Sequence, residues 1–209
     1  MEIAIIGAGN VGTTLGNAWI KRGHEVVFGI RDHQSAKARS LAQQFPAVRL
    51  LQNSEAAHNA EMIVLATPWQ STEEAVRSCG DLDGKTIIDC TNPLKPDFSG
   101  LEIGFSISGA ERISEWASGA QVFKAMNQIG ARLMDAPHFP GVVKPVMFVC
   151  GEGPLKSSVI LLVDQLGFTV IDAGDLKIAR LLEPYGMLWI HLVLMKKVPG
   201  DFAFALLKK

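Results

Sequence analysis

A glycine pattern near the start of the chain is the feature that could do chemistry. Gly7, Gly9 and Gly12 have the spacing GxGxxG, directly after the apolar residues 3–6 and at the start of residues 11–22, which have helical composition. In such a strand–turn–helix unit, the first glycine permits the tight turn, the second lets the backbone approach a pyrophosphate, and the third allows close helix packing. The amides at the helix N-terminus then face the phosphates. The pattern predicts a dinucleotide site in which a β-carbon at Gly9 would collide with the cofactor.

Two other structures can share this glycine pattern. A glycine-rich turn can serve helix–strand packing alone, without a ligand. A P-loop has the spacing of Gly7 and Gly12, but Thr13 stands where its phosphate-binding lysine would have to be. The apolar strand before the turn and the helix after it favour the dinucleotide site.

The residues after the second expected strand indicate which dinucleotide binds. NAD-binding proteins place an acidic residue about 20 positions downstream of the glycines to hold the ribose hydroxyls. Here the chain reads Gly29-Ile30-Arg31-Asp32. Gly29 leaves space, and Arg31 offers a 2′-phosphate a charge-assisted hydrogen bond worth about 1.5–3 kcal/mol, which predicts a preference for NADP(H) of ~10- to 100-fold. Asp32 leaves a second interpretation open, since it can hold a ribose hydroxyl or pair with Arg31 at the surface.

Two further strand ends lie at the edge of the sheet where doubly wound folds bind their ligands. After the fourth expected strand come Ala66, Thr67 and Pro68, and we expect the backbone of the first two to border the cofactor. The alternative is an ordinary strand exit in which Pro68 opens the next helix. After the fifth expected strand, Asn92 stands nearer the nicotinamide, where it could orient the carboxamide or the ribose.

Short apolar runs alternate with amphipathic segments, which is the pattern of βαβ units in a parallel sheet. The expected strands are residues 3–6, 26–28, 48–51, 62–66, 86–89, 122–125, 145–150 and 169–172. The expected helices are residues 11–22, 35–44, 54–58, 71–78, one that starts near the capping-box pair Ser108 and Glu111, then 154–166 and 176–197, the last with a kink or break at Glu183-Pro184. We therefore predict an α/β fold with a doubly wound, mainly parallel sheet of the NAD(P)-binding Rossmann type. Residues 1–140 would form the NADP-binding domain, and residues 141–209 a small C-terminal lobe packed on the same sheet.

Composition and charge disfavour several classes of protein. The net charge is -1 and the chain has no basic run, so the electrostatic footprint of nucleic-acid binding is missing. The longest apolar stretch near the C-terminus, residues 185–195, is well short of the ~20 residues of a membrane-spanning helix. The first residues lack the basic region of a cleaved signal. We expect no nucleic-acid partner, no membrane span and a cytoplasmic location.

The cysteines and histidines suggest neither a disulfide framework nor a metal site. Cys79, Cys90 and Cys150 are odd in number, widely spaced and set in apolar stretches, so we expect buried, reduced thiols. The histidines have no ligand spacing such as HExxH. The apolar C-terminal region is too hydrophobic for exposure, which predicts a homodimer.

The whole chain resembles the NADPH-dependent reductases of the deazaflavin coenzyme F-420, the F-420H2:NADP+ oxidoreductases. The stretches that carry the resemblance are residues 7–12, 23–26, 65–69, 89–93, 122–127, 179–184, 187–190 and 201–204. The resemblance implies direct hydride transfer between nicotinamide and deazaflavin, stacked in an apolar cleft between the Rossmann domain and the small lobe. Such a transfer needs alignment and exclusion of water more than an acid or base. The chain is also similar to the cytoplasmic NADPH domains of membrane ferric reductases, which pass electrons to flavin.

The same resemblance implies roles for single residues. The residues that would bind the pyrophosphate of NADP(H) are Gly7, Gly9, Asn10, Val11 and Gly12, and Arg31 would bind the 2′-phosphate. The residues that would border the rest of the cofactor are Ala66, Thr67, Pro68 and Asn92. Those that would border the hydride-accepting ring are Pro93, Lys124, Met126 and Asn127. Two positions depart from the family: Ile30 replaces a small hydroxyl residue, which weakens a phosphate contact, and Met126 replaces the more usual Phe, which reshapes the ring pocket.

Three functions remain open at this point. The first is exchange of hydride between NADP(H) and coenzyme F-420; the second is reduction of another acceptor, such as flavin, ferric chelate, imine or ketone; the third is a non-catalytic NADPH-binding sensor. An imine or ketone reductase should place a proton donor near the nicotinamide, whereas deazaflavin reduction should show an apolar, ring-sized slot without one. A serine hydrolase is disfavoured because the sequence has no GxSxG elbow.

Overall fold

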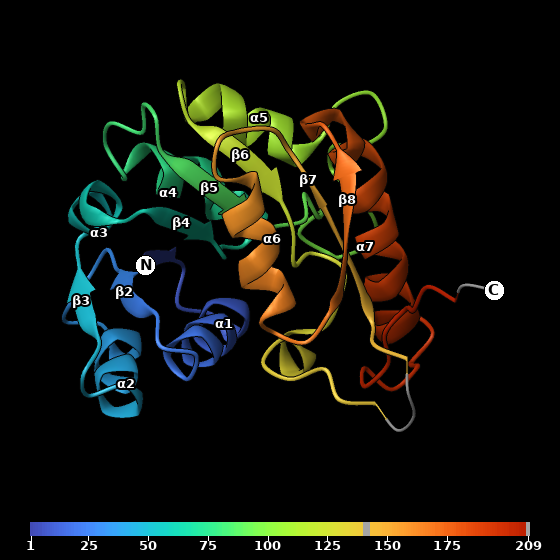
Figure 1. The fold of residues 1–209 in the computed structure, drawn as a ribbon, viewed down its shortest axis with the longest axis horizontal. Coiled ribbons are helices and arrows are strands. Elements are labelled where there is room, and N and C mark those ends of the chain that lie inside the picture. Colours follow the sequence, from blue (N-terminus) through green and yellow to red (C-terminus); the bar gives the residue numbers. More distant parts are fainter. Residues whose placement is uncertain (140–142, 208–209) are drawn as a thin grey trace.

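Eight strands form one sheet in the computed structural model, which describes residues 1–139 and 143–207 (Figure 1). The strands are β1 (Glu2–Ile6), β2 (Glu25–Gly29), β3 (Arg49–Leu51), β4 (Met62–Leu65), β5 (Thr86–Asp89), β6 (Gln121–Lys124), β7 (Val146–Cys150) and β8 (Thr169–Gly174). Their order across the sheet is β3-β2-β1-β4-β5-β6-β7-β8. Neighbouring strands are parallel except β6 and β7, which meet antiparallel at Lys124 and Cys150. The expected doubly wound, mainly parallel α/β fold is therefore confirmed.

Helices cover both faces of this sheet. They are α1 (Asn10–Ile20), α2 (Ala36–Gln44), α3 (Asn53–Asn59), α4 (Thr72–Arg77), α5 (Gly109–Trp116), α6 (Lys156–Asp164) and α7 (Ala179–Leu194), with short 3-10 helices η1 (Trp69–Ser71), η2 (Ala131–Leu133) and η3 (Leu176–Ile178). One apolar core packs α1, α2 and α6 against one face. A second apolar core packs α3, α4 and α5 against the other face. On that face α7 packs beside α5. Because both faces are covered, the strands are continuous apolar runs in the sequence.

The strand order creates a switch point between β1 and β4. The chain moves outward from β1 through β2 and β3, then returns so that β4 pairs with the other side of β1, with Ile6 aligned to Leu65. In open parallel sheets, ligands bind beyond the carboxyl ends of the strands at such a point. The residues that follow β1, β2, β4, β5 and β6, where the sequence predicted a site, all leave the sheet at this edge.

Strand β7 pairs with β8 along its length but with β6 at one position alone. Two other parts of the chain therefore bond the backbone groups of β7 that β6 leaves free. The side-chain amide of Gln128 replaces a strand at Phe148: its Nε2 donates to the carbonyl oxygen at 2.9 Å, and its Oε1 accepts from the amide at 3.0 Å. The amide of Val146 donates to the carbonyl of Phe204 in the C-terminal segment at 2.9 Å. The expected boundary between residues 140 and 141 lies outside the described residues, and the division into a domain and a lobe stays a prediction.

The helix α7 runs through Pro184 without a break. A proline inside a helix removes one donor and disfavours helix at the preceding residue, so the sequence predicted a kink or break here. The preceding residue, Glu183, is instead fixed by tertiary contacts: its carboxylate accepts from the amides of Gly109 and Ala110 at 2.8 and 3.0 Å. These contacts offset the local cost of the proline, and a break at this position was a wrong expectation.

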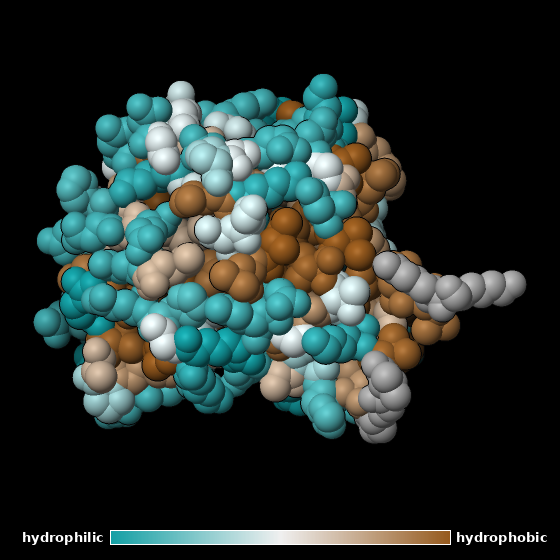
Figure 2. All heavy atoms as spheres, in the orientation of Figure 1, coloured by the Kyte–Doolittle hydropathy of each residue, from teal (hydrophilic) through white to brown (hydrophobic). Residues whose placement is uncertain are grey.

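The surface of the molecule is not uniformly polar. Figure 2 shows a face that is largely hydrophilic, with apolar residues gathered between α6 and α7. On α7 itself, Leu181 and Leu188 are 63% and 47% exposed. None of the helices in the described parts of the chain has the length and apolar character needed to cross a bilayer.

Candidate cofactor site

Two of the three glycines after β1 are required by the fold itself. Gly7 adopts a φ of +109°, and a β-carbon there would lie 2.5 Å from the carbonyl oxygen of Ala66. A β-carbon at Gly12 would collide with the carbonyl oxygen of Gly7. The amide of Ala66 donates to the carbonyl of Ile6 at 2.9 Å, which holds the exit of β4 against the turn. Gly7 therefore serves the turn and Gly12 the close approach of α1, as the sequence predicted.

Gly9 is different, because no described part of the chain requires a glycine there. Its φ is -82°, and a β-carbon would meet no atom of the described chain within 4 Å. It is the N-cap of α1, and no side chain caps that first turn, where Asn10 is exposed and Val11 half-buried. An uncapped helix N-terminus behind open space is suited to an anion. A pyrophosphate fits this cradle and would occupy the space that Gly9 leaves open.

A cavity of about 370 Å³ adjoins the glycine turn. It lies between the residues after β2 and those after β4. Among the residues that line it are four of the predicted cofactor residues, namely Gly7, Arg31, Thr67 and Pro68. The strand ends thus bring together residues that are far apart in the sequence. We call this the nucleotide cavity.

Several residues that line the nucleotide cavity were not singled out from the sequence, among them Ser35 and Lys37. The hydroxyl oxygen of Ser35 accepts from the amide of Ala38 at 3.1 Å and caps α2 at the cavity wall. Lys37, in the first turn of α2, adds a second cation to Arg31, and that turn contains no acidic residue. A serine at this position is a recognisable sign of a helix start, but an isolated lysine on a polar helix usually faces only solvent. Together the two cations suit a phosphate group.

Arg31 and Asp32 do not pair with each other. A guanidinium nitrogen of Arg31 lies 2.7 Å from a carboxylate oxygen of Glu74, and both side chains are more than half exposed. Asp32 accepts from the amide of Gln34 at 2.8 Å, a local turn that leads into α2. Because an exposed ion pair contributes at most about 1 kcal/mol, Arg31 can exchange Glu74 for a phosphate. The surface pairing considered for Asp32 is not formed.

The exit of β4 is fixed by two threonine hydroxyls. Thr72 donates to the carbonyl of Pro68 at 3.0 Å, and its oxygen lies 2.9 Å from the hydroxyl of Thr67. Pro68 also precedes η1 as its N-cap. Pro68 opens a short helix, as one interpretation of this segment had it. Thr67 and Pro68 line the nucleotide cavity and Ala66 does not, so the expected contact of the Ala66 and Thr67 backbone with a cofactor stays a prediction.

Asn92 and Asn127 hold each other at the ends of β5 and β6. The amide nitrogen of Asn92 donates to the carbonyl of Asn127 at 2.8 Å, and that of Asn127 donates to the side-chain oxygen of Asn92 at 3.0 Å. Asn127 also donates to the carbonyl of Leu182 at 3.0 Å and is 5% exposed, so its amide is used inside the fold. Asn92 is half-buried. It is not among the residues that line the nucleotide cavity, and its expected contact with the cofactor stays a prediction.

Lys124 lies in the protein interior, not at a ring pocket. Its ammonium nitrogen is 2.6 Å from Asp89, 2.8 Å from Glu183 and 2.8 Å from the carbonyl of Thr91, and the lysine and both carboxylate side chains have no exposed surface. Burial by itself lowers the pKa of Lys124, but the two carboxylates outweigh burial and raise this pKa above its usual range. Its three donors are occupied, so the expectation that Lys124 borders the acceptor ring is corrected: it ties β5, β6 and α7 together.

A second cavity, of about 580 Å³, lies between α7 and the loop that follows β5. Its lining comprises Ser99, Gly100, Leu101, Gly104, Phe105, Pro184, Met187, Leu188 and His191. The loop is anchored near the sheet, because the amide of Glu102 donates to the carbonyl of Pro93 at 2.7 Å. His191 is the one titratable side chain in this lining. We call this the apolar cavity.

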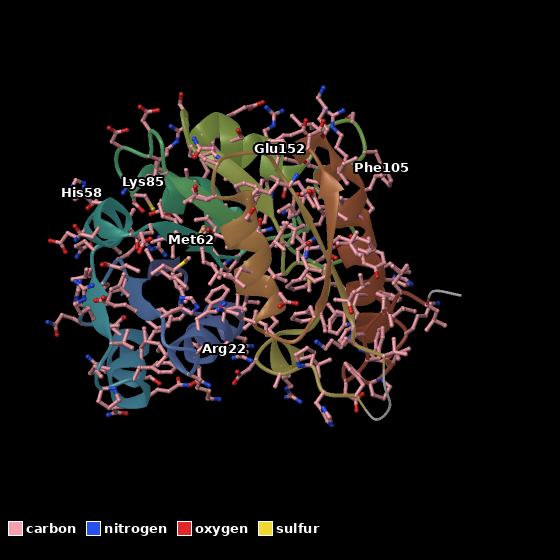
Figure 3. All side chains as sticks on the ribbon, in the orientation of Figure 1. Arg22, His58, Met62, Lys85, Phe105 and Glu152 are labelled. Carbon is pink, nitrogen blue, oxygen red and sulfur yellow. The ribbon has the colours of Figure 1, made fainter. Side chains whose placement is uncertain are left out.

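The loop of the apolar cavity was not singled out from the sequence. Phe105 is 76% exposed and has a φ of +62°, and Figure 3 shows it at the outer side of the loop beside α7. An isolated Phe between small residues gives no periodic signal, so its position could not be expected. The apolar cavity therefore has an exposed aromatic side chain at its rim.

Met126 and Pro93 lie outside the lining of both cavities. Met126 is fully buried in the core on the α1 face, with a φ of +61° that is unusual for a residue with a side chain. This turn brings the next residue, Asn127, back to Asn92. Pro93 is buried against the start of α5. Their expected contact with an acceptor ring is therefore not seen in this geometry, because both pack into the interior.

The cysteines are free and buried, as the sequence predicted. Burial raises the pKa of the Cys79 thiol to about 12, so this thiol is not a nucleophile near neutral pH. Within residues 1–139 and 143–207, no group of three His, Cys, Asp or Glu side chains could hold a metal ion. The two cavities are therefore the sites to interpret.

The strand order, the glycine turn and the nucleotide cavity define a Rossmann-type dinucleotide-binding protein. The family model described as NADP oxidoreductase, coenzyme F420-dependent, matches residues 2–93. A candidate F420-dependent NADP reductase from Arthrobacter sp. FB24 is 30% identical, with 99% of each chain covered and a TM-score of 0.88. The chain belongs to this family of NADP oxidoreductases, and the resemblance seen in its sequence is confirmed.

Other relatives are more distant. A hypothetical protein from Sinorhizobium meliloti is 28% identical over 84% of this chain and 85% of its own, with a TM-score of 0.72. A reductive aminase from Aspergillus terreus, solved with NADPH, is 23% identical, covers 94% of this chain and 64% of its own, and has a TM-score of 0.68, which shows the shared fold alone. A curated glycerol-3-phosphate dehydrogenase [NAD(P)+] from Chlorobium phaeobacteroides is 32% identical over 108 residues, 46% of this chain and 32% of its own. The chain thus matches about a third of that curated relative.

Proposed function

We propose that this protein binds NADP(H) in the nucleotide cavity and exchanges hydride with the deazaflavin coenzyme F-420. The observation that carries the proposal is the cavity itself, which joins the glycine turn to two cations, Arg31 and Lys37. A pyrophosphate and a 2′-phosphate are the two anionic parts of NADP(H), and the cavity offers a helix N-terminus for one and paired cations for the other.

The residues at the next strand ends would hold the nicotinamide half. Asn92 follows β5 with its side-chain oxygen fixed by Asn127, so its amide can orient a carboxamide without first becoming ordered. NADPH, when bound, supplies the hydride. The protein's contribution is alignment and exclusion of water, and the proton that balances deazaflavin reduction can come from solvent.

The apolar cavity supports a flat, largely apolar acceptor. Apart from Ser99 and His191, its lining consists of apolar residues and glycine. The loop of this cavity is hydrogen-bonded to Pro93, the residue after Asn92. A ring that accepts hydride needs no protein acid there. His191 is the observation that favours the second candidate, an imine or ketone reductase, because that reaction needs a proton donor. Flavin or ferric chelate as acceptor, and a sensor that reacts with none of them, complete the alternatives.

A homodimer through α7 is part of the proposal. Leu181, Pro184, Leu188, His191 and Met195 follow one another at spacings of three and four residues, and the leucines and the methionine are 63%, 47% and 45% exposed. This spacing places them on one helix face, as in helices that pair with another helix. Leu188 is the midpoint of the series. In an antiparallel pair of α7 helices centred on Leu188, the same five residues of the second copy would lie opposite this series. Such a copy would also cover the open side of the apolar cavity.

One experiment separates the candidate activities. NADPH oxidation is followed in parallel with coenzyme F-420, free flavin, a ferric chelate, and a set of imines and ketones as acceptors. The proposal predicts turnover with F-420 that survives His191→Asn, because no protein acid is needed. Turnover confined to imines or ketones and lost in His191→Asn would establish the reductase alternative. NADPH binding without turnover of any acceptor would establish the sensor.

A further inference from the structure

Asn53 lines the nucleotide cavity and has a buried side-chain oxygen that accepts no hydrogen bond from the described residues. It is the first residue of α3, directly beyond β3, is 5% exposed, and lines the cavity. Its side-chain nitrogen donates to the hydroxyl of Ser78 at 2.8 Å. Its side-chain oxygen has no donor among the described residues. A buried carbonyl oxygen without a donor is costly, and one at a cavity wall points to a ligand.

The orientation of this amide is determined by its neighbours. The Ser78 hydroxyl donates to the carbonyl of Ala75 at 2.7 Å, so it must accept from Asn53, and a flipped amide would lose that bond. A β-carbon at Gly29 would lie 2.6 Å from the Asn53 oxygen. Gly29 therefore leaves the room that the oxygen occupies, and Ser78 keeps the oxygen, not the nitrogen, directed there.

The order of the strands indicates which part of a nucleotide reaches this oxygen. The glycine turn follows β1, Arg31 follows β2, and Asn53 follows β3, which is the next strand outward. The proposed site places the pyrophosphate at the first position and the 2′-phosphate of the ribose at the second. The base is the part of the nucleotide beyond that ribose. Ile30, Pro68 and Ala75 also line the cavity and offer apolar surface for an aromatic ring.

We propose that the side-chain oxygen of Asn53 accepts a hydrogen bond from the exocyclic amine of adenine and makes the site specific for that base. The inference rests on the proposed NADP(H) site and goes beyond it, because neither the glycine turn nor the cations distinguish one base from another. The exocyclic amine is the donor that adenine has and hypoxanthine lacks. With hypoxanthine, a carbonyl oxygen would face the Asn53 oxygen instead.

Equilibrium binding tests this assignment without turnover. Titration calorimetry compares NADPH with an analogue in which hypoxanthine replaces adenine. The wild-type protein should bind the analogue about tenfold more weakly. Asn53→Ala should bind NADPH about three- to tenfold more weakly than wild type and distinguish the two ligands by about twofold at most. Asn53→Asp keeps an acceptor oxygen and should keep the discrimination.

A matched control is Asn59→Ala, the same change at the exposed end of α3. The side-chain nitrogen of Asn59 donates to the backbone carbonyl of Glu55 at 3.3 Å. It should bind both ligands as wild type does. Equal binding of the two ligands by the wild type, or undiminished discrimination in Asn53→Ala, would overturn the assignment, and the wild-type comparison holds even if a variant does not fold. A wild-type protein that binds neither ligand would instead contradict the proposed NADP(H) site.

Discussion

The ammonium nitrogen of Lys124 lies 2.6 Å from a carboxylate oxygen of Asp89, and neither side chain has any exposed surface. Glu183 of α7 completes this buried cluster, 2.8 Å from the same nitrogen, and its carboxylate also accepts from the first amides of α5. One buried lysine thus joins two strands of the sheet to the helix that forms a wall of the apolar cavity.

Lys124→Met should destabilise the protein strongly. The change leaves two buried carboxylates without their cation, which costs about 3–5 kcal/mol of unfolding free energy. Denaturant unfolding followed by circular dichroism measures this loss. The control is Lys156→Met, whose pairs with Glu152 and Asp172 involve two well-exposed carboxylates, so its loss should be about 1 kcal/mol or less. Similar losses for both variants would show that the buried cluster has no special role.

Gly9→Ala should separate cofactor binding from folding. A β-carbon at position 9 meets no atom of the described chain within 4 Å, so the unfolding free energy should change by about 1 kcal/mol at most. NADPH affinity should fall at least about tenfold, because the added methyl occupies the pyrophosphate cradle. Gly7→Ala is the contrast: its φ of +109° and the nearby Ala66 oxygen should make that variant unstable. Unchanged NADPH affinity in Gly9→Ala would contradict the binding of a pyrophosphate at Gly9.

The pair of Glu111 and Arg180 should make stability depend on pH. Hydrogen bonds from the Arg180 guanidinium, followed by those from Ser108, hold the pKa of Glu111 at about 2, against an ordinary value of 4.5. Because the folded-state pKa is lowered, the pair stabilises the protein above about pH 4.5, and this contribution is lost as the pH falls toward 2. Glu111→Gln should therefore cost about 1–2 kcal/mol at pH 6 after solvent screening. The difference from wild type should shrink as the pH falls, and a constant difference would contradict this origin.

The sequence was informative where a feature is local. Gly7, Gly9 and Gly12 could be interpreted because the turn, its strand and its helix are adjacent in the chain. The sheet followed from the alternation of apolar and amphipathic segments. Lys124 could not be placed in this way, because its partner Glu183 lies on a helix far along the chain, and an apolar strand with one lysine also fits a ligand site. The orphaned oxygen of Asn53 likewise depends on Ser78 and Gly29, which no local pattern connects to it.

Leu188→Lys should prevent the proposed dimer. In an antiparallel pair of α7 helices centred on this residue, the change would place two ammonium groups opposite each other in an apolar seam. Sedimentation equilibrium at micromolar concentration should show a dimer for wild type and a monomer for the variant. Leu161→Lys provides the control, because Leu161 is also exposed, at 52%, but lies on α6. A wild-type protein that sediments as a monomer would contradict the proposed dimer.

The most direct test of the NADP(H) site is the ratio of dissociation constants for NADH and NADPH, measured by calorimetry on wild type, Arg31→Ala and Arg49→Ala. The proposed NADP(H) site predicts a wild-type preference for NADPH of about 10- to 100-fold, reduced roughly tenfold or more in Arg31→Ala. Arg49 is an exposed arginine paired with Glu2 and Glu25, and its loss should leave the ratio unchanged. Equal wild-type affinity for the two nucleotides, or a preference that Arg31→Ala does not reduce, would contradict the binding of a 2′-phosphate by Arg31.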